Sequence, residues 1–188
     1  MRDMARQAAP AGFHAVLARL DRAELAACRR FNSVVYRARL LRTFRIASRL
    51  GDGVVWYTLI AGLALFFGDE GRRAALQCVF AGVTGLLLYR VIKGVLVRER
   101  PFITHSSIVC AGHPLDRFSF PSGHTLHAVT FTLIACSAAP ILALLLVPLA
   151  IMVAMSRVVL GLHYPSDVLA GGAIGAGLAF ATLSWLPV

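Results

Sequence analysis

Five long apolar runs follow residue 53, and they constrain the fold more than any other feature of the chain. They cover residues 54–68, 75–97, 124–139, 141–160 and 168–186. Crossing the hydrocarbon core of a bilayer takes about 20 helical residues, so these runs predict membrane helices. The first and third runs are short and need flanking residues to complete a crossing. With 58% hydrophobic residues, the chain is also too apolar for a soluble domain of its size.

We therefore expect an all-α, multi-pass transmembrane helical bundle of about five or six membrane helices over residues 51–188. The fifth run contains AGGAIGAGLAF, and its small residues allow close helix packing in lipid. Residues 1–50 form a different segment that carries eleven arginines. Its stretch FNSVVYRARLLRTFRIASRL spaces apolar residues as a helix does. This predicts a basic amphipathic helix region at the membrane interface, with a solvated basic helix as the alternative.

The net charge of +10 points to anionic partners. Anionic headgroups of the bilayer fit this charge, because the arginines are concentrated before the first apolar run. No RNA- or DNA-binding motif accompanies them, so we expect no nucleic-acid partner. The four cysteines show no C-x-x-C spacing, and neither a disulfide framework nor a metal site is expected.

Two polar loops, residues 98–122 and 161–167, separate apolar runs. With five crossings, both loops fall on the same face of the membrane. Lys93 and Arg100 lie on that side as well, and their spacing of seven residues would point them the same way on a helix. Cations so close to hydrocarbon usually mark a functional site. Snorkelling side chains at a helix end are the alternative.

The stretch FPSGHTLHA begins the third run. Ser122 is a natural N-cap residue, and Gly123 lets the backbone approach a ligand closely. The helix that starts near His124 would offer unpaired amides and the positive end of its dipole to an anion. A single histidine at this position is more often structural, so this stretch alone does not decide the function.

The stretch SRVVLGLHYPSD holds the most informative spacing. Arg157 ends the fourth run, Gly161 breaks the helix, and His163 lies in the short loop that follows. Pro165 suits the first turn of the fifth helix, with Asp167 just inside it. Asp167 is near enough to accept a hydrogen bond from one imidazole nitrogen of His163. That bond would leave the other nitrogen free as a nucleophile.

Together these stretches supply three cations, a helix amino terminus, two histidines and one carboxylate on one membrane face. Phosphoryl transfer needs this set, because charge must be balanced around the phosphorus while a nucleophile and an acid act in line. The remaining carboxylates after residue 50 are scattered, and we expect no chemical role for them: Asp52, Asp69, Glu70, Glu99 and Asp116.

The same residues resemble the signature of the type 2 phosphatidic acid phosphatase superfamily. This signature reads Lys, six residues, Arg-Pro; then Pro-Ser-Gly-His; then Ser-Arg, five residues, His, three residues, Asp. The family contains membrane lipid phosphate phosphatases, with acid phosphatases and vanadium haloperoxidases as soluble relatives. The resemblance covers about residues 51–186. Every signature position is met, by Lys93, Arg100, Pro101, Pro121, Ser122, Gly123, His124, Ser156, Arg157, His163 and Asp167.

The resemblance implies that His163 attacks phosphorus and forms a phosphohistidine, while Asp167 orients and polarises it. His124 would protonate the leaving lipid oxygen and then activate water. The residues implied to hold the phosphate are Lys93, Arg100, Ser122, Gly123 and Arg157. The family works without a metal or other cofactor, and the sequence has no carboxylate cluster suited to magnesium.

We expect an integral membrane phosphatase that removes a phosphate monoester or diphosphate end from a lipid. The candidate substrates are polyprenyl diphosphates such as undecaprenyl diphosphate, phosphatidic acid and phosphatidylglycerophosphate. A lipid phosphotransferase with a lipid or sugar acceptor is one alternative, and a non-catalytic transporter or scaffold is another.

The chain suits a bacterial inner membrane. Members of the family usually have six crossings, and we expect the basic segment to replace the first one here. The positive-inside rule places residues 1–50, and with them the site, in the cytoplasm. Many bacterial relatives instead work on the outer face, so both orientations stay open.

Overall fold

The computed structural model describes residues 11–114 and 116–185. The first ten residues of the basic segment therefore lie outside the described part. Helices dominate, which confirms the predicted all-α class, and Glu99 and Phe118 form an isolated β-bridge. The elements are α2 (Ala11–Asn32), the 3-10 helix η1 (Ser33–Tyr36), α3 (Ala38–Leu50), α4 (Val54–Phe66), α5 (Gly68–Val95), α6 (Pro101–Thr104), α7 (Gly123–Ala138), the 3-10 helix η2 (Pro140–Leu142), α8 (Ala143–Val159) and α9 (Pro165–Trp185).

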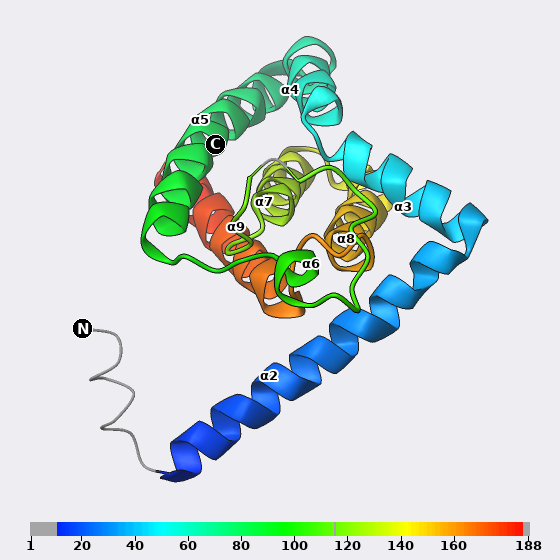
Figure 1. The fold of residues 1–188 in the computed structure, drawn as a ribbon. Coiled ribbons are helices and arrows are strands. Elements are labelled where there is room, and N and C mark those ends of the chain that lie inside the picture. Colours follow the sequence, from blue (N-terminus) through cyan, green and yellow to red (C-terminus); the bar gives the residue numbers. More distant parts are fainter. Residues whose placement is uncertain (1–10, 115, 186–188) are drawn as a thin grey trace.

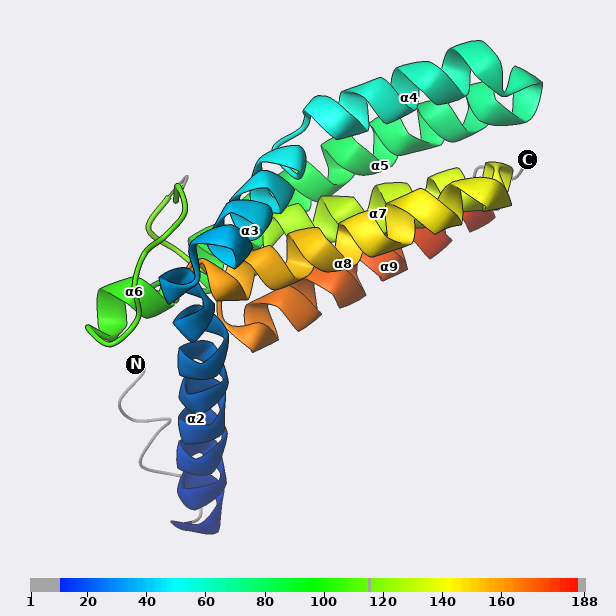
Figure 2. The ribbon, with the colours of Figure 1, turned by 90° about the vertical axis from the view of Figure 1, so that its right-hand side faces the viewer.

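Helix α7 lies inside the bundle, in contact with α5, α8 and α9 (Figure 1). In the side view, the axes of α4, α5, α7, α8 and α9 are roughly aligned with one another (Figure 2). The core between them includes the buried side chains of Trp56, Leu63, Phe131 and Val153. Many large apolar side chains of α4, α5 and α8 are exposed instead, as is expected for helices that face lipid tails.

Each of the five predicted apolar runs forms a helix, but not all of these helices are long enough to cross a bilayer. Among the described residues, α5, Pro140–Val159 and α9 are long and apolar enough. Helices α3 and α4 would together make a fourth span, bent by 51° at the break between them. Helix α7 has 16 residues, or about 24 Å of helix. The predicted five or six crossings are therefore not confirmed.

Small residues bring α9 close to α7, as the sequence predicts. A Cβ atom on Gly175 would lie 2.4 Å from the carbonyl oxygen of Leu126, which is closer than any side chain can approach. A Cβ atom on Gly171 would lie equally close, 2.4 Å, to the carbonyl oxygen of Ser122. Glycine at these two positions lets the backbones touch, and this contact holds the start of α7 against the start of α9.

The arginine-rich segment is helical in its described part, as its spacing predicts, and it packs against the bundle. Helix α3 lies along α8 and buries Phe44 against Leu160 and Leu162, while its arginines stay exposed. Helix α2 runs across the loop-bearing end of the bundle (Figure 2) and contacts α8 and α9. Its placement at a membrane interface remains a prediction.

Candidate active site

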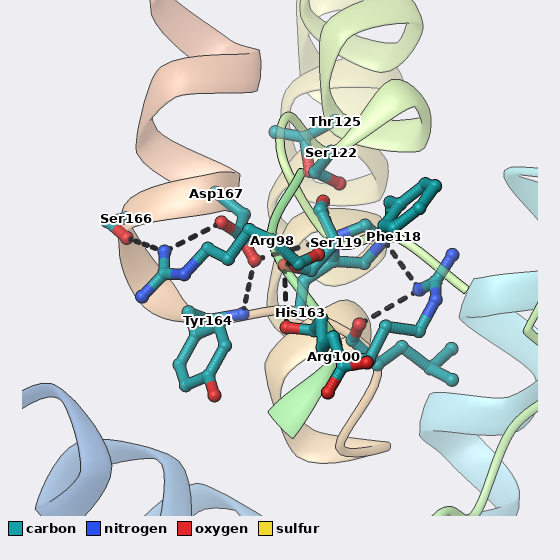
Figure 3. Close-up of polar contacts among 12 residues, drawn as sticks. Arg98, Arg100, Phe118, Ser119, Ser122, Thr125, His163, Tyr164, Ser166 and Asp167 are labelled. Atoms are coloured by element: carbon teal, nitrogen blue, oxygen red, sulfur yellow. Dashed lines mark hydrogen bonds and ion pairs between the residues drawn. The ribbon is translucent and has the colours of Figure 1, made fainter. Parts of the chain in front are cut away.

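The signature residues converge at the end of the bundle that carries the long loop after α5 and the short loop between α8 and α9. Arg100 comes from the long loop and His163 from the short one, and their side chains touch. The starts of α7 and α9 are joined there by the amide of Ser122, which donates to the carbonyl of Asp167 at 3.0 Å. Segments that are far apart in sequence thus build one site (Figure 3).

Lys93 and Arg100 meet at the carboxylate of Asp116. Lys93 Nζ lies 2.6 Å from Asp116 Oδ2, and Arg100 Nη2 lies 3.1 Å from Asp116 Oδ1. The helical spacing argument for this pair was wrong, because α5 ends at Val95 and Arg100 is the N-cap of α6. Their convergence depends on the loop, which folds back so that the carbonyl of Asp116 also accepts Arg100 Nε–H at 2.7 Å.

The ring of His163 is buried and its tautomer follows from its partners. Arg100 Nη1 lies 3.2 Å from His163 Nε2, and a guanidinium can only donate, so Nε2 carries the lone pair. The proton is then on Nδ1, which donates to the carbonyl of Ser119 at 2.7 Å. Burial, together with the charges of Arg157 and Arg100, holds the pKa of His163 well below its ordinary value. The ring is therefore a neutral imidazole with its lone pair toward the cations.

Asp167 has a different position from the one expected. Its Oδ2 lies 3.8 Å from His163 Nδ1, beyond hydrogen-bond distance. The carboxylate instead accepts the backbone N–H of Tyr164 at 2.8 Å and Arg98 Nη1 at 2.8 Å. The carbonyl of Ser119 therefore fixes the ring of His163, while the fully buried Asp167 lies beside the ring without a hydrogen bond to it.

The start of α7 lies as predicted, with Ser122 as its N-cap. The hydroxyl of Ser122 bonds the hydroxyl of Thr125 at 2.9 Å rather than a backbone amide. Gly123 is the first residue of the helix, so its amide belongs to the unpaired group at the amino terminus. The ring of His124 reaches Asp52, with Nε2 2.5 Å from Oδ1. Asp52 follows α3, in the turn before α4.

Arg157 lies at the end of α8 and is 2% exposed. Its Nη1 donates to the hydroxyl of Ser48 at 2.6 Å. Its Nε is buried without a hydrogen-bond partner in the described part of the chain, and such a donor costs free energy until it meets an acceptor. An anion with several oxygens would supply that acceptor.

A tight turn carries His163 back toward this site. The amides of Leu162 and His163 both donate to the carbonyl of Arg157, each at 3.0 Å. Gly161 makes the turn possible with a φ of +74°, and a Cβ atom there would lie 2.6 Å from the carbonyl oxygen of Val109. Only glycine combines this dihedral with this close approach.

Sequence reasoning missed residues that contact the predicted site residues. Asp52 and Asp116 were expected to have no role, yet Asp52 touches His124 and Asp116 joins Lys93 to Arg100. Ser119 acts through its carbonyl, which no side-chain pattern reveals. A signal did exist for Asp116, because it lies in the polar loop that the topology places beside the site.

The arrangement suits a tetrahedral phosphate. Lys93, Arg100 and Arg157 supply positive charge, and the amino terminus of α7 adds unpaired amides. A neutral imidazole with a fixed tautomer supplies a nucleophile. A second imidazole, His124, can donate or accept a proton. These groups can bind a phosphate ester, attack its phosphorus and protonate the oxygen that leaves.

Residues 74–188 match the family model of the PAP2 superfamily. The undecaprenyl-diphosphatase of Sulfolobus acidocaldarius is 32% identical over 141 residues, which cover 72% of this chain and 66% of that protein. The decaprenylphosphoryl-5-phosphoribose phosphatase of Mycobacterium tuberculosis is 31% identical over 146 residues, which cover 77% of this chain and 80% of that protein. The chain thus spans about two thirds or more of these relatives.

Two crystal structures share the fold. A transmembrane PAP2-type phosphatidylglycerolphosphate phosphatase from Bacillus subtilis aligns with a TM-score of 0.70 at 25% identity, over 88% of this chain and 85% of that one. LpxE of Aquifex aeolicus aligns with a TM-score of 0.74 at 26% identity, over 85% of this chain and 94% of that one. With its own apolar helices, this similarity identifies the chain as an integral membrane protein.

Proposed function

The chain belongs to the PAP2 superfamily, as its signature residues predict, and on this premise we propose that it removes phosphate from a membrane lipid through a phosphohistidine. The substrate carries a phosphate monoester or diphosphate end. Polyprenyl diphosphates, phosphatidic acid and phosphatidylglycerophosphate are the candidates. Because several similar proteins are bacterial, we assign the enzyme to a bacterial inner membrane.

One observation carries the mechanism: His163 is a buried neutral imidazole whose Nε2 lone pair points at the cation Arg100. A histidine with only a structural role has no need of a guanidinium at its unprotonated nitrogen. A nucleophile does, because the same cation can bind the phosphate oxygens and bring the phosphorus to Nε2. Arg157 and Lys93 add to the positive charge around the ring.

In the first step, the Nε2 lone pair of His163 forms a bond to phosphorus, and the bond from phosphorus to the lipid oxygen breaks. His124 enters the step as an imidazolium paired with Asp52, gives one proton to that oxygen and becomes neutral, so the lipid leaves as an alcohol or a monophosphate. The ring of His163 gains positive charge as it attacks. Ser119 keeps the Nδ1 proton in place, and the buried carboxylate of Asp167, 3.8 Å away, stabilises the charge.

In the second step, a water molecule attacks the phosphorus and His124 accepts its proton. The phosphorus–nitrogen bond breaks, inorganic phosphate leaves, and His163 returns to its neutral form. Asp52 holds the ring of His124 during both transfers through its contact of 2.5 Å. The lipid tails can stay in the bilayer throughout, because the site lies at the end of the bundle.

The test is phosphate release by the purified protein from polyprenyl diphosphate, phosphatidic acid and phosphatidylglycerophosphate. Wild-type protein should act on at least one of them, and His163→Ala should lose turnover while trapping no phosphoenzyme. Arg72→Ala is the control, because Arg72 is exposed near the start of α5, where it pairs with Asp69, and it should keep full activity. Labelled lipid or sugar acceptors in the same assay separate hydrolysis from phosphotransfer. Full phosphate release by His163→Ala would refute the proposal.

A further inference from the structure

Arg98 makes more contacts with charged and aromatic groups than its place in a surface loop requires. Its Nη1 donates to Asp167 Oδ1 at 2.8 Å and to the hydroxyl of Ser166 at 2.7 Å (Figure 3). Its Nη2 donates to Glu24 Oε2 at 2.6 Å. Its guanidinium carbon lies 3.9 Å from the centre of the Tyr164 ring. One cation thus joins the acid of the signature, the loop beside His163 and helix α2.

Asp167 depends on Arg98 for its countercharge. The Asp167 side chain is 0% exposed. Among the described residues, Arg98 and the ring of His163 lie within ion-pair distance of it, and the ring is neutral, so Arg98 is the one cation there. A buried carboxylate without a partner is strongly disfavoured. The backbone of Asp167 also accepts the amide of Ser122, so a shift of Asp167 would disturb the start of α7 as well.

Glu24 in turn holds Arg98. Its Oε2 accepts from Arg98 and its Oε1 accepts the backbone N–H of Ser166 at 2.9 Å. That amide lies in the first turn of α9, where no partner within the helix is available. Burial acts to raise the pKa of Glu24, but the hydrogen bonds from Ser166 and Arg98 outweigh it and hold that pKa below its ordinary value. Glu24 is therefore ionised at neutral pH.

Helix α2 is anchored at this point along one face. Asn32 accepts the amide of Val109 at 2.8 Å and donates to the carbonyls of Val109 and Val159, both at 2.9 Å. Cys28, which lies one turn after Glu24, is buried against Tyr164. Residues 24, 28 and 32 follow the helical period, so a single stripe of α2 docks on the site.

We propose that Arg98 is a positioning residue for the catalytic reaction and that Glu24 of helix α2 holds it in place, which makes α2 part of the active site. The catalytic half of this inference, the effect of Arg98 on turnover, rests on the proposed function; the docking of α2 does not. Arg98 pairs with Asp167 and fixes it beside His163, and Glu24 prevents the partly exposed Arg98 side chain from turning to solvent. Three of the five N–H donors of Arg98 already bind Ser166, Asp167 and Glu24, so we assign Arg98 to positioning and not to substrate binding.

The kinetic test compares Arg98→Gln, Glu24→Gln and the double variant with wild type. We expect kcat to fall about 10- to 100-fold in each single variant, with KM within about threefold of wild type. The double variant should match Arg98→Gln, because Glu24→Gln keeps an oxygen that can accept the Ser166 amide and loses only the ion pair with Arg98. Arg98→Lys, which keeps one charged contact, should recover part of kcat. Arg117→Gln is the control, because Arg117 is an exposed arginine of the same loop that pairs with Glu99.

An unchanged kcat in both single variants would overturn the inference while leaving the phosphatase proposal intact, provided that His163→Ala is inactive. A rise in KM with kcat unchanged would also overturn it, because Arg98 would then be a substrate-binding residue. Additive losses in the double variant would disprove the link through Glu24.

A second measurement does not need turnover. Burial raises the pKa of Cys28 to about 12, so this thiol should react slowly with a maleimide while α2 is docked. In a Cys110→Ser background, Arg98→Gln should speed the labelling of Cys28 at least fivefold, and Arg117→Gln should not. Equal labelling in all of these proteins would refute the coupling of Arg98 to α2. Wild-type protein without phosphatase activity would refute the catalytic half together with the proposed function.

Discussion

Replacing Asp116 with asparagine should strengthen the binding of phosphate analogues. The carboxylate of Asp116 contacts Lys93 at 2.6 Å and Arg100 at 3.1 Å, the two cations that we assign to phosphate binding. A substrate phosphate must therefore compete with it. Asp116→Asn removes the competing charge and keeps the Oδ1 acceptor, which the amide of Phe118 uses at 3.1 Å.

The size of the effect follows from these contacts. A hydrogen bond between charged groups contributes about 1.5–3 kcal/mol when buried. The Asp116 side chain is 33% exposed, so we take about 1 kcal/mol for each of its two contacts. Together they amount to about 2 kcal/mol, which corresponds to about 30-fold in a binding constant.

The assay is inhibition by orthovanadate, which mimics pentacoordinate phosphorus, with the purified protein. We expect the Ki of vanadate to fall about 30-fold in Asp116→Asn. Asp69→Asn is the control, because Asp69 pairs with Arg72 on the exposed surface of α5 and should leave the Ki unchanged. A Ki that stays the same or rises would show that Asp116 organises the two cations instead of competing for them.

Three further predictions concern the nucleophile, the packing and the orientation. Because the pKa of His163 is held well below its ordinary value, the ring stays neutral as the pH falls, and kcat should persist below about pH 6.5; a loss of kcat with its midpoint near that value would contradict the assignment. Gly175→Ala should lower the free energy of unfolding by about 2 kcal/mol through overpacking against Leu126, as measured by thermal unfolding in detergent. Gly177→Ala should not, since its Cβ atom would meet nothing within 4 Å. Cys110 is exposed on the loop beside the site, so the positive-inside rule predicts that a membrane-impermeant maleimide labels it only after the cells are opened. Labelling of intact cells would place the site on the outer face.

The helices were predictable because each apolar run is a property of a continuous stretch of sequence. The observed helix boundaries differ from the predicted ones where charged residues belong to a helix. Helix α5 begins at Gly68, because Asp69 and Glu70 suit the first turn of a helix. Apolarity also could not give the number of crossings, because α4 and α7 are short and their burial depends on neighbouring helices.

The sequence motifs named side chains that the fold brings together in the candidate site, but they did not predict the contacts among them. The signature places His163 and Asp167 four residues apart, and this spacing suggested a hydrogen bond that the turn at Gly161 does not form. The carbonyl of Ser119 takes that bond. Asp116, Arg98 and Glu24 reach the site through loop folding and helix docking, which depend on contacts between distant parts of the chain.

The carboxylates of Asp116 and Asp52 have a consequence for selectivity in a salty medium. These two carboxylates partly neutralise the basic groups of the site. A chloride ion carries the same single charge as a carboxylate, so it would gain little free energy by displacing one. A phosphate group carries more charge and offers more oxygens to the same donors, including the unpartnered Nε of Arg157. On the proposed function, phosphate binding exchanges one anion for another. A competing anion binds only if its free energy of interaction with the basic groups exceeds that of the carboxylates.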